Sequence, residues 1–428
     1  MSPSILRLTP TTQSYDWGSR SALHSLLGRE QDGEPLAELW MGAHPKGPSS
    51  ASADGGPPVS LADLIRADPV AMLGQRVLDD YGPRLPYLLK VLAADRALSL
   101  QLHPAPHMAR AGFNRENREG VPRGSAERSF HDDQHKPEMV VAVSRFEGLS
   151  GFRRPARVLE LLEGLRGDLV AGMRAALEAQ PSAAGIREAF TLALHARTAP
   201  DVAVDLAVTV ADVRARLAAG TTSPRADETV VALAEQHPGD PAVVVSMMLN
   251  RVTLEPGEAM FVPAGHVHAY LSGCAVEVMS SSDNVLRAGL TSKHVDVEAL
   301  LACASYGAGP AARPRVRRLG VERMPPGRPA GLSATTGLLE YRAAVPEFAL
   351  VAGEQTVDDG AVALPAEGPR IVLVLEGQIE VECSAVRSGP ADESLRAVVR
   401  SGESVFVPHA AGTLALRGSG RTVVAYVP

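Results

Sequence analysis

Two histidines follow a turn whose residue types suit a metal site. His266 directly follows Gly265, and His268 comes two residues later. Upstream of that glycine, five residues separate Gly257 from Pro263. Glycine allows a tight turn or a reversal at positive φ, and proline ends strand pairing. Alternate side chains of a strand share a face, so a strand here would present both imidazoles together. Because neutral imidazole is the commonest metal ligand, the segment predicts a metal site, the alternative being a structural turn with hydrogen-bonded histidines.

Two upstream segments supply other ligand types. Residues 98–103 alternate between apolar and polar side chains, which predicts a strand with Gln101 and His103 on its polar face. Farther along, Lys136 and Glu138 alternate at the start of an apolar run and would also share a face. Two imidazoles, a carboxylate and an amide oxygen would make a four-ligand site for a divalent cation. Its net positive charge suits Lewis-acid chemistry.

The combined motifs resemble type I mannose-6-phosphate isomerases, which are members of the cupin superfamily. The turn before His268 has the spacing of the second cupin motif, found in double-sheet jelly rolls that hold a metal at the barrel mouth. The resemblance is dense over residues 1–153 and 240–305, and elsewhere it extends only to general layout. The segments that carry it are 15–18, 38–45, 101–104, 136–139, 146–152, 268–270 and 284–289.

The resemblance implies one Zn²⁺ per chain. By this comparison the zinc ligands are Gln101, His103, Glu138 and His268. His266 is not among them, and we expect it to orient a neighbouring ligand or to be exposed.

The implied reaction interconverts mannose 6-phosphate and fructose 6-phosphate through an enediol, by proton transfer between C1 and C2. Such a transfer requires an acid and a base near these carbons and positive charge near the oxygens. The family's active-site arginine corresponds to Arg287, and because a guanidinium keeps its proton it fits an electrostatic role. Candidate contacts to the hexose 6-phosphate substrate are Lys90, Ser99, Lys293 and Trp17.

Several residues are candidates for the general base. Glu277 interrupts an otherwise apolar strand, where desolvation would raise its pKa toward a useful value. The alternative for this residue is a structural salt bridge with Arg287 or a lysine. The remaining candidates for the catalytic base are Lys136, Asp283 and His135.

Composition excludes several classes of partner. The chain has 428 residues, 45% of them hydrophobic, and a formal net charge of −7, which permits a large core but does not suit nucleic acid. The cysteines Cys274, Cys303 and Cys383 are far apart in sequence, which indicates a reducing compartment. No uninterrupted apolar run reaches the roughly 18 residues of a membrane span. We therefore expect a cytoplasmic monomer with no membrane or nucleic-acid partner.

Hydrophobic periodicity divides the chain. Apolar residues recur at helical spacing from Val158 to Leu177, and alanine-rich helical segments continue to about residue 235. Strand-like patterning resumes with the apolar run 242–248. We therefore expect a helical insertion that interrupts a catalytic barrel, whose two parts are separate in sequence.

An internal repeat indicates a second barrel. Residues 400–408 repeat the pattern of residues 255–263, but Thr413 stands where His268 would be, so this barrel should hold no metal. The expected fold is mainly β with a helical insertion: two cupin-like jelly-roll barrels plus an α-helical domain. The expected domains are the catalytic barrel (1–153 and 240–313), the helical insertion (154–239) and a degenerate C-terminal barrel (314–428).

Two other function classes remain open. One is another cupin metalloenzyme, such as an iron oxygenase, although the amide ligand and the basic phosphate contacts argue against it. The other is a non-catalytic sugar-phosphate-binding cupin, which the complete ligand set of the first barrel disfavours. Zinc content with oxygen-independent activity would exclude the oxygenase, and turnover of a sugar phosphate would exclude the binding protein.

Overall fold

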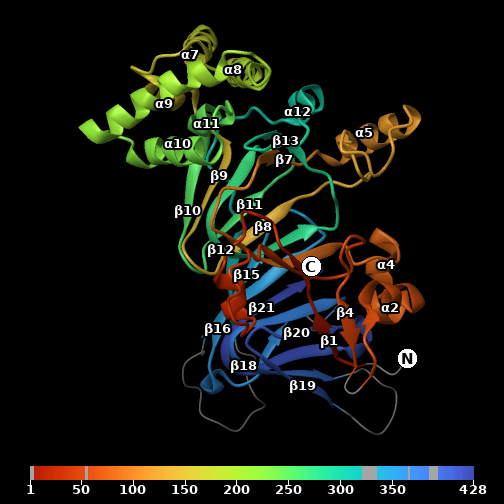
Figure 1. Ribbon diagram of the computed structural model, residues 1–428. Helices are drawn as coiled ribbons and strands as arrows, with labels where there is room; N and C mark the ends of the chain where they lie inside the picture. The colour runs from red at the N-terminus through yellow and green to blue at the C-terminus, as the bar shows by residue number, and fades with distance from the viewer. Residues whose placement is uncertain (1–3, 54–55, 321–334, 365–366, 385–393) are drawn as a thin grey trace.

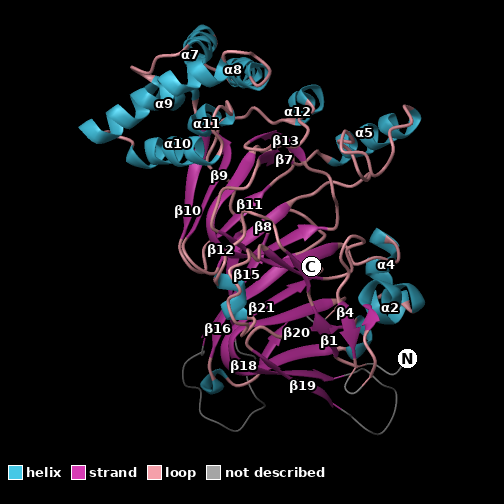
Figure 2. Cartoon of the chain, viewed as in Figure 1, coloured by secondary structure: helices cyan, strands magenta, loops and turns pink. Residues whose placement is uncertain are grey.

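The strands form two large, mostly antiparallel sheets, and the longest helices gather beyond one of them (Figure 1, Figure 2). Across the described residues, no helix is long and apolar enough to cross a bilayer. The computed structural model describes residues 4–53, 56–320, 335–364, 367–384 and 394–428.

Strand β12 (His268–Ser280) is the centre of the ten-stranded sheet. Its antiparallel partners are β6 (Tyr87–Ala94), β7 (Leu100–Leu102), β8 (Glu138–Ala142) and β9 (Phe146–Phe152). The sheet also contains β2 (Thr11–Gln13), β3 (Glu38–Met41), β10 (Leu249–Leu254), β11 (Ala259–Val262) and β13 (Leu286–Gly289). Leu100 and Leu102 are fully buried and Gln101 between them is not, which confirms the predicted alternation.

The eleven-stranded sheet combines both ends of the chain. Strand β1 pairs with β20, so the N-terminal segment closes onto strands from the last hundred residues or so. The N-terminal members are β1 (Leu6–Thr9), β4 (Ser50–Ser52) and β5 (Val59–Ser60). The C-terminal members are β14 (Arg315–Gly320), β15 (Thr335–Arg342), β16 (Ala349–Gln355), β17 (Val362–Leu364), β18 (Arg370–Ser384), β19 (Ser394–Arg400), β20 (Ser404–Val407) and β21 (Thr413–Tyr426). Hydrogen bonding therefore joins residues that lie on either side of the expected boundary at residue 314.

The helical periodicity expected after residue 154 is confirmed. Prolines at the first helical positions of α6 and α10 and a serine side-chain cap at Ser182 begin three of these helices. Their apolar stripes, including Met173 and Phe190, are buried in one hydrophobic cluster. The helices are α6 (Pro155–Leu162), α7 (Asp168–Ala179), α8 (Ala183–Ala196), α9 (Val202–Ala219) and α10 (Pro224–Gln236).

The sequence had suggested a strand over the apolar run 242–248, and this prediction is wrong. The run forms α11 (Ala242–Val245) followed by a short 3₁₀ helix (Ser246–Met248), and the strand begins only at Leu249. Asp240 Oδ1 accepts the backbone N–H of Ala242 at 2.9 Å, which favours helix initiation. The run is buried on every side and its single polar residue, Ser246, is buried too, so pattern alone could not separate helix from strand.

The remaining α-helices of the described residues cover other edges of the sheets (Figure 2). They are α1 (Ala22–Leu26), α2 (Leu61–Ala67), α3 (Pro69–Leu73), α4 (Gln75–Tyr81), α5 (Pro106–Arg118) and α12 (Val297–Cys303).

One hydrophobic cluster joins the two sheets. It contains Leu89 and Val276 of the ten-stranded sheet together with Leu8, Ile371 and Phe406 of the eleven-stranded sheet. The predicted repeat is visible in the turns before β11 and β20. The glycines of these turns, Gly257 and Gly402, have φ of +85° and +78°. The two sheets therefore share a core and support each other.

We predict that Phe406→Ala destabilises the whole chain. Phe406 is 0% exposed and belongs to the shared cluster, so its truncation should lower the free energy of unfolding by about 3–5 kcal/mol. Val357→Ala is the control, because Val357 is 69% exposed and should matter by no more than about 0.5 kcal/mol. Urea unfolding measures both, and equal effects would contradict the assignment of Phe406 to a joining core.

Candidate metal centre and cavity

His103, Glu138 and His268 form a buried cluster at the ends of neighbouring strands. Their ligand atoms all lie within 4.8 Å of one another. His103 Nε2 is 3.1 Å from Glu138 Oε1, and His268 Nε2 is 3.4 Å from Glu138 Oε2. Among the described residues, neither Nε2 atom has a partner with hydrogen-bond geometry. Because unpaired buried nitrogens are costly, the residues fit a cation between the two imidazoles and the carboxylate.

The opposite nitrogen of each imidazole is held by a backbone carbonyl. His103 Nδ1 is 2.7 Å from the carbonyl oxygen of Asn284, and His268 Nδ1 is 3.0 Å from that of His266. A carbonyl can only accept, so each Nδ1 carries the proton and each Nε2 keeps its lone pair. Burial lowers the pKa of His103 to about 4, so this ring is neutral at neutral pH.

Gln101, the fourth predicted ligand, reaches the same region from β7. Its backbone pairs with His268 on one side and with Arg287 on the other, and its side chain lines the cavity described below. His266 lies in the turn before β12 and contributes its carbonyl, so the two histidines do not share a strand face. The structure thus clusters three of the predicted ligands, places Gln101 on a strand that pairs with His268, and leaves His266 outside the cluster.

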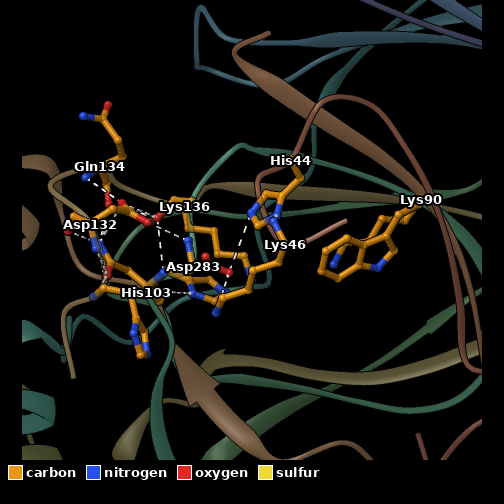
Figure 3. Close-up of polar contacts among 12 residues, drawn as sticks. His44, Lys46, Lys90, His103, Asp132, Gln134, Lys136 and Asp283 are labelled. Carbon is orange, nitrogen blue, oxygen red and sulfur yellow. Dashed lines mark hydrogen bonds and ion pairs between the residues drawn. The ribbon is translucent and has the colours of Figure 1, made fainter. Parts of the chain in front are cut away.

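A buried network holds the loop before β8 against the loop before β13 (Figure 3). The side-chain amide of Asn284 donates to the carbonyl oxygens of Asp132 at 2.8 Å and Gln134 at 2.7 Å. Its Oδ1 accepts the backbone N–H of His131 at 2.7 Å. Because the main-chain carbonyl of Asn284 also orients His103, the network sets the direction of a metal ligand.

The cluster borders a cavity of about 630 Å³, which is within the size range of small-molecule sites. Of the cluster, Glu138 lines this cavity, whereas His103 and His268 are not among the described residues that do. His135 does not line it either: its Nε2 lies 2.6 Å from Glu347 Oε1, in the loop before β16. The predicted site residues that do line the cavity are Trp17, Lys90, Ser99, Gln101, Lys136, Glu138, Glu277, Asp283, Arg287 and Lys293.

Glu277 is held in the cavity wall by two neighbours. It is 2% exposed, Lys90 Nζ is 3.2 Å from its Oε2, and the Tyr270 hydroxyl donates to its Oε1 at 3.0 Å. Burial and then the Glu138 carboxylate raise the pKa of Glu277, while Lys90 opposes them. Burial alone would lower the pKa of Lys90, but the carboxylates of Glu38 and Glu277 raise it, so Lys90 stays charged.

Arg287 lies on β13 and lines the cavity, and it makes no ion pair with another described residue. Glu277 and Asp283 were its expected structural partners. Among the described residues, Arg287 forms an ion pair with neither of them. Asp283 instead lies 3.2 Å from Lys46 Nζ and 3.6 Å from His44 Nε2 (Figure 3). Burial lowers the pKa of Arg287, and Tyr15 opposes this.

Sequence reasoning missed part of the cavity wall. Tyr270 stands two positions after His268 on β12, so strand alternation could have placed it beside the ligands. No local pattern could have indicated His237, which follows α10 and reaches the cavity from the helical insertion. The missed lining residues that are polar, charged or aromatic are Tyr15, Asp16, Glu38, Trp40, His44, Lys46, Arg96, His131, Gln236, His237, Tyr270, Ser282, Thr291 and Ser292.

Comparison with known proteins agrees with this geometry. Residues 5–155 match the family profile of the phosphomannose isomerase type I catalytic domain. The mannose-6-phosphate isomerase of Escherichia coli (strain K12) is 40% identical over 309 residues, 71% of this chain and 76% of the relative. That of Emericella nidulans is 32% identical over 421 residues, 88% and 87% of the two chains.

Solved structures extend the similarity to the whole chain. Mannose 6-phosphate isomerase from Salmonella typhimurium bound to its substrate, fructose 6-phosphate, and zinc superimposes with a TM-score of 0.81 at 32% identity, covering 99% of both chains. A zinc-bound mannose 6-phosphate isomerase gives 0.80 at 33% identity, with the same coverage. Given these similarities and a metal cluster built from the predicted residues, the chain belongs to the type I phosphomannose isomerases, also called mannose-6-phosphate isomerases.

Proposed function

We propose that this protein is a mannose-6-phosphate isomerase that uses one zinc ion per chain to interconvert mannose 6-phosphate and fructose 6-phosphate. The observation that carries the proposal is the pair of buried imidazole nitrogens without hydrogen-bond partners beside Glu138, which itself lines a cavity that also contains Lys90, Arg287 and Lys293. Relatives of this name and a zinc- and substrate-bound relative support it.

Gln101, His103, Glu138 and His268 would hold the zinc. When bound, zinc supplies Lewis-acid polarisation of the sugar oxygens. Glu138 is the one anionic residue of this set, so the centre retains a net positive charge that favours the developing enediolate.

Glu277 is the residue we assign to move the proton between C1 and C2. It is a desolvated carboxylate, and its raised pKa makes it a stronger base than an exposed glutamate. Lys90 and Tyr270 fix its two oxygens, so the group is held in one orientation in the cavity wall.

The other candidate bases are supported less. Lys136 Nζ lies 2.9 Å from Glu138 Oε1, so its charge is paired with a metal ligand. Asp283 is paired with Lys46. The contact of His135 with Glu347 directs it toward the C-terminal sheet.

The phosphate of the substrate is assigned to the side of the cavity formed by Ser99 and Lys293. Both line the cavity, and Lys293 has no carboxylate partner among the described residues. Arg96 also lines the cavity and adds positive charge, so a dianion would meet charge-assisted contacts there.

We also propose the finer architecture expected from the sequence. The two sheets would each form a cupin-like jelly roll, with the first completed by residues 240–313 and interrupted by the helical insertion 154–239. The antiparallel pairing and the glycine turns before β11 and β20 support this layout. All three cysteines are free, which supports a reducing, cytoplasmic environment.

His268→Ala should lose zinc and isomerase activity together, because it removes a ligand atom. His266→Ala is the matched control: it keeps the carbonyl that orients His268 and should retain zinc. Metal analysis of the purified proteins measures the difference, and wild type should contain about one zinc per chain. A His268→Ala protein that keeps both metal and activity would remove this residue from the ligand set.

Lys293→Ala should raise KM for mannose 6-phosphate, because a charge-assisted contact of about 1.5–3 kcal/mol is lost. Free mannose should be a very poor substrate of the wild type for the same reason. A coupled assay of fructose 6-phosphate formation compares the two sugars. Equal kcat/KM values for them would overturn the sugar-phosphate assignment and favour a different cupin function.

Arg287→Ala should lower kcat by about a hundredfold, as expected when one electrostatic stabiliser of the transition state is removed. Zinc content and the thermal midpoint should stay close to wild type, since Arg287 makes no ion pair that holds the described fold together. A lowered midpoint with preserved kcat would assign a structural role instead. A rise in KM alone would place the guanidinium on the phosphate.

A further inference from the structure

A turn with a rare backbone conformation follows β13 and forms one edge of the cavity. Leu290 has a φ of +54° and is the only residue other than glycine with a positive φ in the part of the chain that the structure describes. Leu290 and the next three residues, through Lys293, all line the cavity. A left-handed leucine is sterically disfavoured, so surrounding contacts must hold it in place.

Two side chains from the helical insertion and its junction hold this turn. Asp240 Oδ2 accepts the backbone N–H of Leu290 at 2.8 Å, and Arg197 Nη2 donates to the carbonyl oxygen of Thr291 at 3.2 Å. Arg197 Nη1 also lies 2.7 Å from Asp240 Oδ2. The ion pair therefore binds both the N–H of Leu290 and the carbonyl oxygen of Thr291. The other Asp240 oxygen accepts the N–H of Ala242, which anchors the carboxylate to α11.

Close packing limits any other arrangement. A Cβ added at Gly289 would lie 2.3 Å from the Cβ of Ala242 and 3.0 Å from Asp240 Oδ1. The side chains of Arg197 and Asp240 are only 20% and 11% exposed, so water screens their attraction little. The turn therefore touches the insertion directly, and its shape depends on this contact.

We propose that Arg197 and Asp240 position the substrate's phosphate by clamping the strained turn, so that residues 291–293 face the cavity. The inference rests on the proposed function, because it assigns the phosphate to this edge. It gives the helical insertion a part in binding: Arg197 ends α8, and Asp240 links α10 to α11. Both are positioning residues, since they act through the backbone of the turn.

Loss of the clamp should weaken substrate binding without disturbing the metal. Without it, Leu290 can relax toward negative φ, which turns residues 291–293 away from the phosphate. The metal ligands come from β7, β8 and β12, or directly after β7, and among the described residues no hydrogen bond or ion pair joins them to Arg197 or Asp240. The effect should therefore fall on KM and leave kcat unchanged.

The test compares Asp240→Asn and Arg197→Lys with wild type. Each should raise KM for mannose 6-phosphate by about tenfold and raise the Kd of inorganic phosphate by a similar factor. Zinc content and kcat should stay unchanged. The matched control is Asp212→Asn, because Asp212 also pairs with an arginine at 2.6 Å and accepts a backbone N–H at 2.8 Å in the helical insertion, but does not line the cavity.

A second variant separates positioning from stability. Adding Leu290→Gly to Asp240→Asn should return KM and phosphate Kd toward wild type, because glycine adopts positive φ without strain. The same change should lower the thermal midpoint further, because a buried leucine is lost. A merely structural clamp predicts that binding and stability worsen together, which would overturn the proposal.

The outcomes distinguish this inference from the proposed function. Clamp variants with unchanged KM and phosphate Kd overturn the inference while wild-type turnover still supports the isomerase assignment. If wild type does not convert mannose 6-phosphate, the isomerase assignment fails, and the phosphate Kd of the variants still tests the clamp. If Asp240→Asn does not fold, Arg197→Lys carries the comparison.

Discussion

The charge of Glu138 is the constraint around which the site is built. Removing a carboxylate from water costs several kcal/mol unless cations or hydrogen bonds replace the lost hydration. Burial alone would raise the pKa of Glu138, but the Lys136 ammonium, 2.9 Å from its Oε1, holds it well below its usual range. The residue is therefore ionised in the interior, with two imidazole nitrogens beside it that a single cation would satisfy together.

Alternating charges continue from this carboxylate along the cavity wall. The Tyr270 hydroxyl lies 3.3 Å from Glu138 Oε2 and 3.0 Å from Glu277 Oε1, and Lys90 then bridges Glu277 to Glu38. In a low-dielectric interior such a network is stable only when each member is satisfied. The proposed base thus takes its orientation from the same network that surrounds the metal ligand, while burial and the nearby Glu138 carboxylate raise its pKa.

Parts of the chain far from the metal ligands complete the site. The C-terminal sheet shares a hydrophobic core with the ten-stranded sheet, and its Glu347 contacts His135 in the loop before β8. Arg197 of the helical insertion and Asp240 at its end bind the backbone of the turn at Leu290. His237 of the insertion lines the cavity. Support for the chemistry is therefore spread over nearly the whole molecule, although the metal ligands come from a few strand ends.

Local sequence patterns indicated the three residues of the buried cluster and the main strand and helix periods. Strict alternation over residues 98–103, the glycine and proline turn before His268, and the helical period after residue 154 are signals carried by neighbouring residues. They depend on backbone geometry that is the same in any protein. Where such a period was absent, as in the buried run 242–248, strand was expected and a helix formed.

Only the tertiary structure decided how these elements meet. In the folded chain, Lys90 pairs with Glu277, and His135 pairs with Glu347. Arg197 and Asp240 bind the backbone of the turn at Leu290. These contacts join residues separated by 50 to about 200 positions, and no local periodicity encodes them. Their geometry is set by how whole sheets and helices pack, because the low-dielectric interior admits a charged group only where a distant segment supplies its partner.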